Sequence, residues 1–555
     1  MNSDKNKDKI YTFPGTYLEK IPEYSNKKIF SFEDLENIAQ INPNLKPIHL
    51  EETKESLERK TNKLAAALKQ TSRIGTFPEY LDGISEEEKE RIFENSLGKG
   101  HNAAADLITL TISYIAPRIF TLYLTTFEYG VSMLQKSTRR IEHNGYFVPR
   151  AFLQEKELTE EYESIIKKID EDYNLLLRGY NEEQRKKHRE DAIYIQPLSL
   201  LTTDVLELDL RALWQIFLES GIKSNSKGDK IIDDNTIRDA IFEYTSKTFD
   251  LLRDFDIKLV RNWNTNYNIL QYYPSGSLFL RDTIFFSKAK SKFSDLEFLL
   301  ANSENKENFV LDYSSPILNI GEDNIFNKII ETLKTGNLFE KKHILDILKT
   351  INFKVVRNMD LSLLHQETRH RSIHKEYEPL HVAAMKALIE IERVEEWLHQ
   401  YNFKSVLDLN KNNFKKFLKD TNIEFYFRIP REFKLNCDET YSDEKFEKAK
   451  IVIDDYFKLM KFWEKLHFIT PKTANIVLPH GLKVLVIENI DGYNLIKLSA
   501  ERLCYTAKKE MQEQTEKLRD AISDKNFNMA QLMQPKCYWL GKCPDAVRDC
   551  PKKAF

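Results

Sequence analysis

Two stretches of the sequence decide its organisation: DAIYIQPLSLLTTDVLELDLRAL (Asp191 to Leu213) and TANIVLPHGLKVLVIENIDGYNL (Thr473 to Leu495). Each begins with strand composition and then passes into a segment typical of a helix. Such a change of pattern predicts a strand followed by a helix. The two stretches therefore predict one strand-to-helix unit that occurs twice in the chain.

The spacing of matching residues supports this repeat. In both stretches an Ala precedes a Pro by five residues, and an Asp follows that Pro by twelve. The matching residues are Ala192, Pro197 and Asp209 in the first stretch and Ala474, Pro479 and Asp491 in the second. A period of about 280 residues is far too long for a solenoid. We therefore expect two homologous domains that pack about a pseudo-two-fold axis, as in a symmetric dimer.

A second match lies upstream of these stretches. In the first half, His101 is followed by Phe127-Glu128-Tyr129. In the second half, His343 is followed at the same distance by Arg369-His370-Arg371. The order of the two matches is the same in both halves, which favours a duplicated domain over a chance likeness.

Composition limits the class of protein. The 555 residues carry 83 Lys and Arg against 86 Asp and Glu, a net charge of −3. This balance predicts no general attraction to a nucleic acid polymer or an anionic membrane, so any phosphate-binding surface must be local. The five cysteines are too few for a disulfide framework. With a polar N-terminus that does not resemble a signal peptide, they indicate a reducing, cytoplasmic location.

Several segments carry further structural expectations. The apolar run Leu107 to Phe127 has Pro117 and Arg118 at its centre, so two buried strands are expected rather than a membrane span. Glu155 to Arg189 is charged with helical spacing and predicts a long exposed helix. Gly221 to Asp234 is expected to be a loop or linker. The pattern gives no interpretation for an insertion around Phe403 to Asp443.

Arg369-His370-Arg371 is the strongest candidate for chemistry. It follows a run with strand character, Leu361 to Leu364, and Gln366 stands three residues before it. Two guanidinium groups around an imidazole suit a phosphate or an electron-rich ring. A solvated basic turn is the alternative reading, since His374 and Lys375 follow.

Two other sites could hold an anion. Ser132, Gln135, Ser137 and Arg139 combine hydroxyls with a cation, as a phosphate site or an ordinary polar loop would. Arg502 shares a helix face with apolar residues and should point toward the core. A buried Arg needs a partner, and Glu510 is the expected one. A structural ion pair and an anion ligand both fit this Arg.

These residues resemble those of flavin-dependent thymidylate synthase. The resemblance rests on the order His…Arg-His-Arg…Ala-x-x-Val-Leu-Pro…Arg-Leu-Cys-x-x-Ala-x-x-Glu and on a tail with Cys537, Cys543 and Cys550. It covers most of residues 310–550 and, more faintly, 95–220. The family pattern continues Arg-His-Arg-x-x-Ser-x-Asn-Glu-x-Ser-x-Arg-Tyr, followed by Ala-Arg-x-x-Leu-Pro.

The two halves keep complementary parts of that pattern. The second half keeps the triplet, Gln366 and Arg502, but has His374, Glu376, Tyr377, Pro379 and His381 at later motif positions. The first half keeps Ser132, Ser137, Arg139 and Arg211, with Gln135 for Glu and Asp209 for Asn. Both halves lack the Arg of Ala-Arg-x-x-Leu-Pro, where Ile193 and Asn475 stand instead.

The resemblance implies roles for these residues. It implies that Arg371 and Arg502 act in catalysis, and that FAD is bound by Arg369, His370, Arg371, His343, Arg211 and Asp209. It implies that a dUMP-like nucleotide is bound by Gln366, Gln135, Ser137, Arg139 and Arg502. The reaction would convert dUMP to dTMP with methylene-tetrahydrofolate and NADPH, by electrostatic preorganisation rather than a protein nucleophile. The alternatives are a flavoprotein of the same fold that acts on a different nucleotide or small substrate, and a non-catalytic descendant.

The implied fold is α+β, with two tandem domains of this family, each a mixed β-sheet with long helices, forming a pseudo-dimer. The expected segments are a lead-in at 1–60, a degenerate first domain at 61–235, a connection at 236–309, a second domain at 310–530 and a Cys-containing tail at 531–555. A homodimer of chains would rebuild a four-unit assembly. No metal site is expected, and Cys537, Cys543 and Cys550 are only weak metal candidates because their spacing is too wide.

Overall fold

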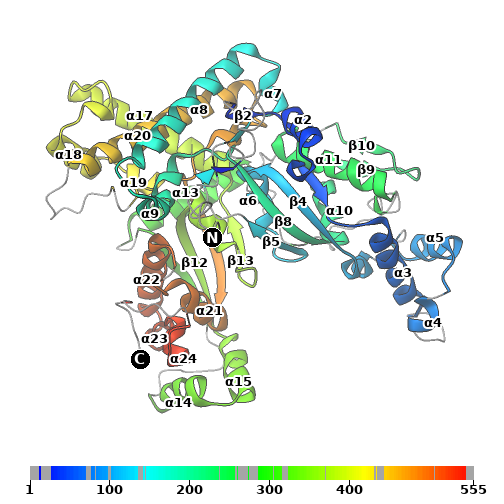
Figure 1. Ribbon diagram of the computed structural model, residues 1–555. Helices are drawn as coiled ribbons and strands as arrows, with labels where there is room; N and C mark the ends of the chain where they lie inside the picture. The colour runs from blue at the N-terminus through cyan, green and yellow to red at the C-terminus, as the bar shows by residue number, and fades with distance from the viewer. Residues whose placement is uncertain are drawn as a thin grey trace, which may run out of the picture. The chain divides into compact units, whose positions relative to one another are not determined.

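The computed structural model describes residues 12–13, 27–70, 77–81, 83–97, 102–135, 142–143, 145–234, 236, 238–256, 259–260, 273, 286–303, 306–314, 323–368, 370–430, 433, 443–505, 507–544 and 550. Helices and strands are mixed along the chain (Figure 1), as the sequence predicts. The chain divides into two compact units. Unit 1 comprises 1–189, 196–281 and 458–478, and unit 2 comprises 190–195, 282–457 and 479–555.

Unit 1 is built on a four-stranded antiparallel sheet of order β3-β4-β8-β5. Its strands are β3 (Ile48–Leu50), β4 (Thr109–Pro117), β8 (Leu201–Asp209) and β5 (Val131–Gln135). The helices that complete its core are α2 (Phe32–Ile41), α6 (Arg118–Thr125), α8 (Lys156–Leu176), α10 (Leu210–Glu219) and α11 (Ala240–Phe255). Tyr244 of α11 is buried against Phe120 and donates a hydrogen bond to the Ile115 carbonyl at 2.7 Å. Aromatic packing therefore fixes α11 to the sheet.

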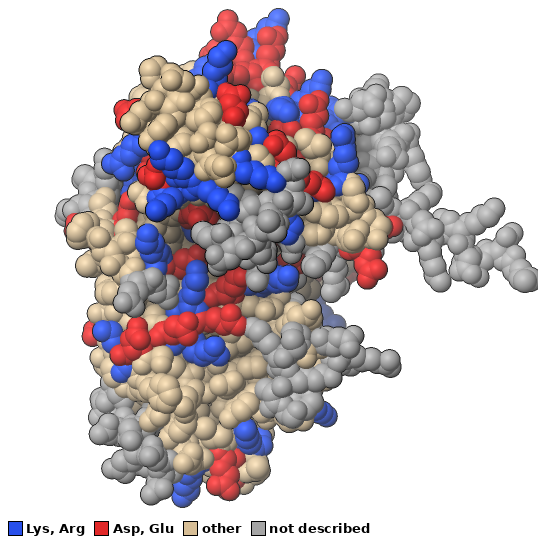
Figure 2. Space-filling model, turned by 90° about the vertical axis from the view of Figure 1, so that its left-hand side faces the viewer, with Lys and Arg blue, Asp and Glu red and all other residues tan. Residues whose placement is uncertain are grey.

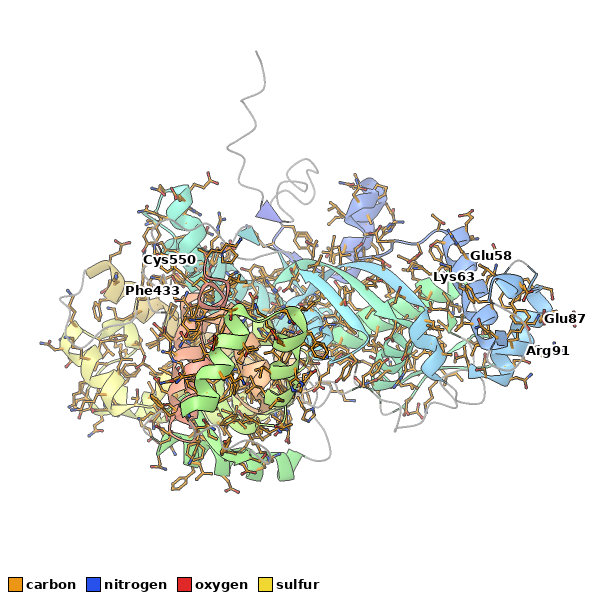
Figure 3. All side chains as sticks on the ribbon, turned by 90° about the horizontal axis from the view of Figure 1, so that it is seen from below. Glu58, Lys63, Glu87, Arg91, Phe433 and Cys550 are labelled. Carbon is orange, nitrogen blue, oxygen red and sulfur yellow. The ribbon has the colours of Figure 1, made fainter. Side chains whose placement is uncertain are left out.

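Outlying helices of unit 1 are more polar. They are α3 (Lys54–Gln70), α4 (Phe77–Leu81) and α5 (Glu86–Asn95). Figure 3 labels Glu58 and Lys63 on α3 and Glu87 and Arg91 on α5. Only one stripe of α3 is buried, with Leu57, Leu64 and Ala65 on it, as expected of an amphipathic helix.

Unit 2 has a matching four-stranded antiparallel sheet of order β11-β12-β14-β13. Its strands are β11 (Asn308–Ser314), β12 (Asn352–Asp360), β14 (Lys483–Asp491) and β13 (His374–Tyr377). One face packs on α14 (Asp323–Thr335), α15 (Leu338–Leu348), α21 (Gly492–Arg502), α22 (Lys509–Ser523) and α23 (Phe527–Leu532) through a large apolar cluster. The opposite face packs on α13 (Phe286–Ala301), where Phe293 and Leu300 meet Val356, Leu485 and Ile487. The sheet of unit 2 is thus covered on both faces.

The two sheets agree in register as well as in order. In unit 1 the central pair runs from Thr109↔Asp209 to Pro117↔Leu201, and in unit 2 from Asn352↔Asp491 to Asp360↔Lys483. Asp209 and Asp491 each cap the helix that follows, accepting a hydrogen bond from the third residue beyond. The aspartates matched by sequence spacing therefore occupy the same place in both sheets.

The edge strands extend this agreement. Ser132 lies opposite Glu207, and His374 lies opposite Asn489, which is the position matching Glu207. Farther along the chain, Tyr146 bridges to Leu200 and Phe427 to Leu482. Between edge strand and bridge, unit 1 has only residues 136–145, whereas unit 2 has residues 378–426.

The longer segment of unit 2 contains three helices: α17 (Leu380–Gln400), α18 (Lys411–Asp420) and α19 (Ile423–Tyr426). The insertion therefore begins well before Phe403, where the sequence places it. The long helix α20 (Asp443–Ile469) follows, and its Tyr456 hydroxyl donates to the Arg428 carbonyl at 2.6 Å. In unit 1 the Tyr162 hydroxyl of α8 donates to the Phe147 carbonyl in the same way, at 2.9 Å. Phe147 and Arg428 are thus matching positions.

Three local expectations differ from the structure. Arg118–Thr125 is a buried helix rather than a second strand, because Pro117 ends β4 and suits the position before a first turn. The segment expected as one long helix is α8 and α9 (Glu182–Ala192), which are separate elements. Part of Gly221–Asp234 forms the hairpin of β9 (Ile222–Ser224) and β10 (Lys230–Ile232). Among the described residues, no helix is long and apolar enough to cross a membrane.

Candidate functional site

The basic triplet follows α16 (Leu361–Glu367) in unit 2. Arg369 lies outside the described residues, His370 is buried, and Arg371 is half-buried. The segment expected to be strand-like, Leu361–Leu364, is helical. The reason is the Asp360 carboxylate, which accepts a hydrogen bond from the Leu363 amide at 2.8 Å and caps this helix.

The turn after the triplet is held by the first turn of α21. The Ser372 hydroxyl donates to Asn494 Oδ1 at 2.5 Å, and Asn494 Nδ2 donates back to the Ser372 carbonyl at 3.2 Å. Asn494 Nδ2 also donates to Asp491 Oδ2 at 2.9 Å. Sequence reasoning missed Asn494, because an Asn three residues after a helix cap has no distinguishing signal.

Arg502 reaches back from the end of α21 to this turn. Its Nε donates to His370 Nε2 at 3.1 Å, and its Nη2 donates to the Gln366 carbonyl at 2.8 Å. The carboxylate beside it is Glu367, with Oε2 at 3.7 Å from Nε. The expectation that Glu510 would pair with Arg502 is wrong, because α21 ends at Arg502 and Glu510 belongs to the next helix, α22.

Glu367 also joins a fully buried ion network. Arg357 Nη1 lies 2.6 Å from Glu367 Oε1 and 2.9 Å from Glu488 Oε2, and all three side chains are 0% exposed. Arg357 Nε donates to Asn308 Oδ1 at 3.2 Å. Burying three charges is costly, and their mutual attraction offsets this cost only with good geometry. Sequence reasoning did not identify this network, because Glu488 and Asn308 lie far from Arg357 and Glu367 in the chain.

Unit 1 builds the same sheet without this network. The sheet register matches Arg357 with Tyr114, Glu488 with Leu206 and Asn308 with Ile48. All three residues of unit 1 are buried. The fold therefore does not require buried charges at these positions. In unit 2 the network lies beside Arg502 through Glu367, and Arg502 in turn contacts His370.

Burial is the main cause that lowers the pKa of His370, to about 4. The charge of Glu367 opposes this shift, whereas those of Arg502, Lys375 and Lys497 reinforce it. The imidazole is therefore neutral at pH 7. Because Nε2 accepts from Arg502, the proton is assigned to Nδ1. Burial also lowers the pKa of Arg371 from its usual value.

We predict an acid-sensitive component of stability from His370. Its folded pKa of about 4 lies below the unfolded value of 6.5, so the unfolded state binds more protons between these values. The free energy of unfolding should then fall as pH drops from 6.5 to 4, by on the order of 2–3 kcal/mol. Denaturant titrations across this range should show the fall in wild type and a smaller one in His370→Gln. An equal fall in both proteins would contradict this assignment.

In unit 1, Asp209 and Arg211 form a separate polar group. Arg211 Nη1 lies 3.2 Å from Asp106 Oδ2, and its guanidinium stands 4.3 Å from the centre of the Tyr273 ring. The Tyr273 hydroxyl donates to Asp209 Oδ2 at 3.2 Å. Burial raises the pKa of Asp209 to about 6. Arg211 thus already has an acidic and an aromatic partner within its own unit.

The matching turn of unit 1 is closed by a glycine instead of a polar pair. Gly130 has φ +75°, and a Cβ there would come within 2.7 Å of Ala212 and Asp209. Gly130 and Ala212 stand where unit 2 has Ser372 and Asn494. Gln135 lies on β5, and its Nε2 donates to the Thr121 hydroxyl at 3.1 Å. Unit 1 has Phe127-Glu128-Tyr129 where unit 2 has the triplet, and the close approach at Gly130 leaves no room for a side chain.

The remaining predicted residues are not gathered at one place. Ser137, Arg139 and His101 lie outside the residues that the structure describes. His343 is exposed on α15, with no interaction with His370 or Arg371 among the described contacts. Of the predicted set, the structure brings together His370, Arg371, Arg502 and the main chain of Gln366.

The cysteines show no common site within the described part of the chain. Cys504 and Cys537 are buried, and Cys543 and Cys550 are partly exposed; Figure 3 labels Cys550. No group of three or more His, Cys, Asp or Glu able to hold a metal ion occurs among the described residues. Cys437 lies outside them.

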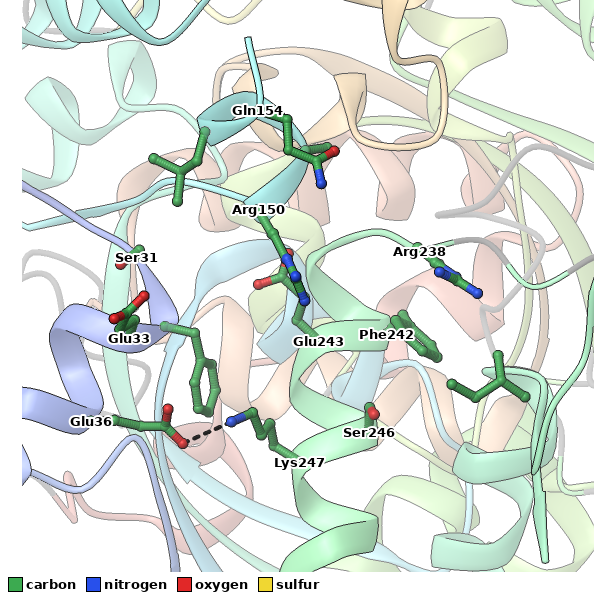
Figure 4. Close-up of a pocket in the computed structure, with 14 residues that line it drawn as sticks. Ser31, Glu33, Glu36, Arg150, Gln154, Arg238, Phe242, Glu243, Ser246 and Lys247 are labelled. Atoms are coloured by element: carbon green, nitrogen blue, oxygen red, sulfur yellow. Dashed lines mark hydrogen bonds and ion pairs between the residues drawn. The ribbon is translucent and has the colours of Figure 1, made fainter. Parts of the chain in front are cut away.

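A groove in unit 1 was not foreseen from the sequence. It measures about 1080 Å³ and runs between α2, α7 (Arg150–Leu153) and α11 (Figure 4). The Arg150 amide donates to Glu243 Oε1 at 2.9 Å, and Lys247 pairs with Glu36 at 2.9 Å. Burial raises the pKa of Glu243 to about 7. Its three cations and three carboxylates balance, so the groove has no evident preference for one ligand charge.

Comparison with known proteins identifies one family. Residues 53–226 match the family model described as thymidylate synthase complementing protein. This match confirms the family resemblance for that part of the chain, which lies in unit 1 except for residues 190–195. The motif-based resemblance is clearer in residues 310–550, whereas the family model recognises the more faintly matching half. No curated protein matches the chain.

Solved structures of similar proteins were also found. The flavin-dependent thymidylate synthase ThyX of Helicobacter pylori, complexed with FAD and dUMP, is 16% identical over 41% of this chain and 99% of that one, with a TM-score of 0.25. The UMP/dUMP methylase PolB of Streptomyces cacaoi is 13% identical over 41% and 96%, with a TM-score of 0.30. TM-scores this low carry no argument about this chain.

Proposed function

We propose that this protein is a flavin-dependent thymidylate synthase-like methyltransferase that converts dUMP to dTMP. The observation that supports this proposal best is the cationic turn of unit 2. There the half-buried Arg371 has no hydrogen bond or ion pair among the described residues, beside a neutral His370 held by Arg502. Solvation of a half-buried guanidinium that has no protein partner is incomplete. An anionic ligand would provide that partner.

These residues fit a flavin nucleotide and a uridine nucleotide. Arg502, Lys375 and Lys497 are the cations whose charges act on the imidazole, and Glu367 is the carboxylate whose charge opposes them. Cations with planar donor groups bind phosphates and stabilise charge that develops on a ring. Arg371 would bind and orient the flavin, and Arg502 would hold His370 with its Nδ1 proton as a donor. When bound, FAD supplies the hydride that completes the methyl group.

The proposal includes a tandem duplication in which the halves contribute different residues. The matched strand orders and registers support it. So does the composition of the units, because unit 2 contains residues 190–195 from the first half and unit 1 contains 458–478 from the second. On this proposal the triplet of unit 2 binds the flavin, while Ser137 and Arg139 bind the nucleotide phosphate. The pseudo-dimer, and a homodimer of chains in solution, remain predictions that a mass measurement in solution can test.

A flavoprotein acting on a different nucleotide is the second candidate, favoured by one observation. Where the family pattern has an Arg before Leu-Pro, Ile193 is buried and Asn475 accepts a hydrogen bond from Trp463 Nε1 at 3.1 Å. Both residues are buried, and neither provides the positive charge that an Arg would have. A nucleotide held without this Arg would bind more weakly, or would differ from dUMP.

The decisive experiment is a methylation assay with the full chain. Protein loaded with FAD is incubated with dUMP, methylene-tetrahydrofolate and NADPH, and dTMP is measured by chromatography. We expect dTMP to form, and to depend on both NADPH and FAD. Protein that retains FAD but yields no dTMP would overturn this proposal in favour of the second candidate. Protein that retains no FAD would overturn both.

A further inference from the structure

Besides the groove of unit 1, the structure has a cavity in unit 2, on the sheet face opposite the triplet. It has a volume of about 720 Å³ and is lined by α13, by the inserted helices α17 to α19, by the ends of β12 and β14 and by Lys517 of α22. Asn358 and Lys483 line it. They alternate along their strands with residues of the other face, such as Arg357 and Glu488. The cavity is therefore separate from the His370 site.

The floor of this cavity is made of buried charges. Arg428 Nε donates to Asp360 Oδ2 at 3.0 Å, and Lys483 Nζ donates to the Glu424 carbonyl at 2.7 Å. Glu307 lies within ion-pair distance of Arg428, Lys483 and Lys517, at 3.6, 3.8 and 2.9 Å. The Lys483 side chain is only 5% exposed.

Unit 1 shows that the fold does not need these charges. The sheet register matches Lys483 with Leu201 and Asp360 with Pro117. The hydroxyl contacts of Tyr456 and Tyr162 match Arg428 with Phe147. At all three places unit 1 has an apolar residue, and it also lacks the inserted helices. Among the described residues, the inserted helices and the charged floor thus occur together in unit 2 and are both absent from unit 1.

Positive charge exceeds negative charge around this cavity. Seven cations line it: Lys306, Lys386, Arg393, Lys419, Arg428, Lys483 and Lys517. Three carboxylates line it, Glu297, Glu307 and Glu424. Three more carboxylates, Asp360, Glu378 and Glu390, pair with these cations from behind the wall. Cations that line the cavity therefore outnumber the carboxylates that line it, and Figure 2 shows Lys and Arg interleaved with Asp and Glu on the side of the molecule that it displays.

Lys483 is the buried lysine of this cavity, and its pKa reflects its surroundings. Burial, followed by the charge of Arg428, lowers the pKa of Lys483 to about 8. Glu307, Asp360 and Glu424 oppose this effect without cancelling it. The ammonium group therefore loses its proton near pH 8, and an anion bound in the cavity would raise its pKa again.

We propose that this cavity binds a small phosphorylated anion through Lys483, Arg428 and Lys517. A lysine is a point charge suited to a phosphate oxygen, and an arginine adds a planar pair of donors. The volume is large enough for a phosphorylated metabolite of nucleotide size. This site is independent of the proposed methyltransferase activity.

Calorimetric titration of the full chain with inorganic pyrophosphate at pH 8 tests this assignment. Binding should raise the pKa of Lys483, so the protein should take up protons, seen as a heat that varies with the ionisation enthalpy of the buffer. At pH 6, where Lys483 is already protonated, this uptake should disappear. Lys483→Leu, which introduces the residue of unit 1, should weaken binding at least tenfold and abolish the uptake.

Two further variants keep the test decisive. Lys517→Gln changes a side chain that is 46% exposed, so it should fold normally and weaken binding severalfold. Lys342→Gln removes one charge from exposed α15, and its binding should equal that of wild type. Equal binding by wild type, Lys517→Gln and Lys342→Gln would overturn the site, as would no binding at all. Citrate that binds as tightly as pyrophosphate would overturn the assignment to phosphate.

Discussion

Replacement of Arg371 by Ala should abolish retention of FAD by the protein. Arg371 is half-buried and has no ion pair among the described residues, so a ligand is the partner for which its charge is available. A charge-assisted contact contributes about 1.5–3 kcal/mol, which corresponds to a loss of roughly tenfold to a hundredfold in affinity. Fluorescence titration of the purified variant with FAD measures this loss directly.

A matched control is Arg91→Ala. Arg91 lies on α5 in unit 1, and its side chain is 66% exposed. This variant should bind FAD as wild type does, because it loses the same charge at a place remote from the triplet in the sequence and in another unit. Unchanged FAD affinity in Arg371→Ala would remove the triplet from the flavin site.

The second large effect concerns the buried network of Arg357, Glu367 and Glu488. Glu367→Ala should lower the free energy of unfolding by about 3–5 kcal/mol, because it leaves the buried Arg357 with one carboxylate instead of two. Chemical denaturation followed by circular dichroism gives this value. Glu501→Ala, an exposed position on α21, is the control and should change stability little.

A triple variant separates the fold from the site. Arg357→Tyr and Glu488→Leu introduce the residues found at the matching positions of unit 1, and Glu367→Thr removes the third charge. Replacing a buried ion network by packed neutral residues is often neutral or stabilising, so this protein should recover most of the stability lost in Glu367→Ala. Its affinity for FAD should nevertheless be lower than that of wild type, because Arg502 has lost the Glu367 carboxylate beside it. Full FAD binding by a stable triple variant would show that the network is structural only.

The strand-to-helix unit that occurs twice could be predicted from the sequence, for a physical reason. Strand register, the capping Asp209 and Asp491 and the edge positions Ser132 and His374 depend on local patterns that a chain must keep to form the same sheet. The two halves share these patterns although their side chains differ at other matched positions. The two sheets therefore follow the alignment of the two halves.

Other elements could not be read from local patterns. Arg118–Thr125 is rich in Ile, Thr, Tyr and Phe, which favours strands, yet burial on all sides allows a helix there. Likewise, the expected pairing of Arg502 with Glu510 assumed one continuous helix, whereas the chain turns at Leu503 and begins α22 at Lys509. Composition does not show where a helix ends when no Gly or Pro marks it.

The candidate site was predicted only in part. The triplet is visible as a cluster of basic residues and Arg502 as a charge on an apolar helix face, and the structure places His370 and Arg502 in contact. Asn494, Glu367 and Arg357 act through tertiary contacts between segments distant in sequence, and their types alone indicate nothing. The cavity behind the sheet also depends on an insertion whose pattern carries no functional signal.

The measurement that tests the central claim most directly is the visible absorption spectrum of the full chain after incubation with FAD and desalting. We predict that flavin bands stay with the wild-type protein, at a ratio near one FAD per triplet site. These bands should be absent from Arg371→Ala. A colourless wild-type protein that cannot be loaded with FAD would contradict this prediction. In that case the chain would have its two matched sheets without the proposed flavin chemistry.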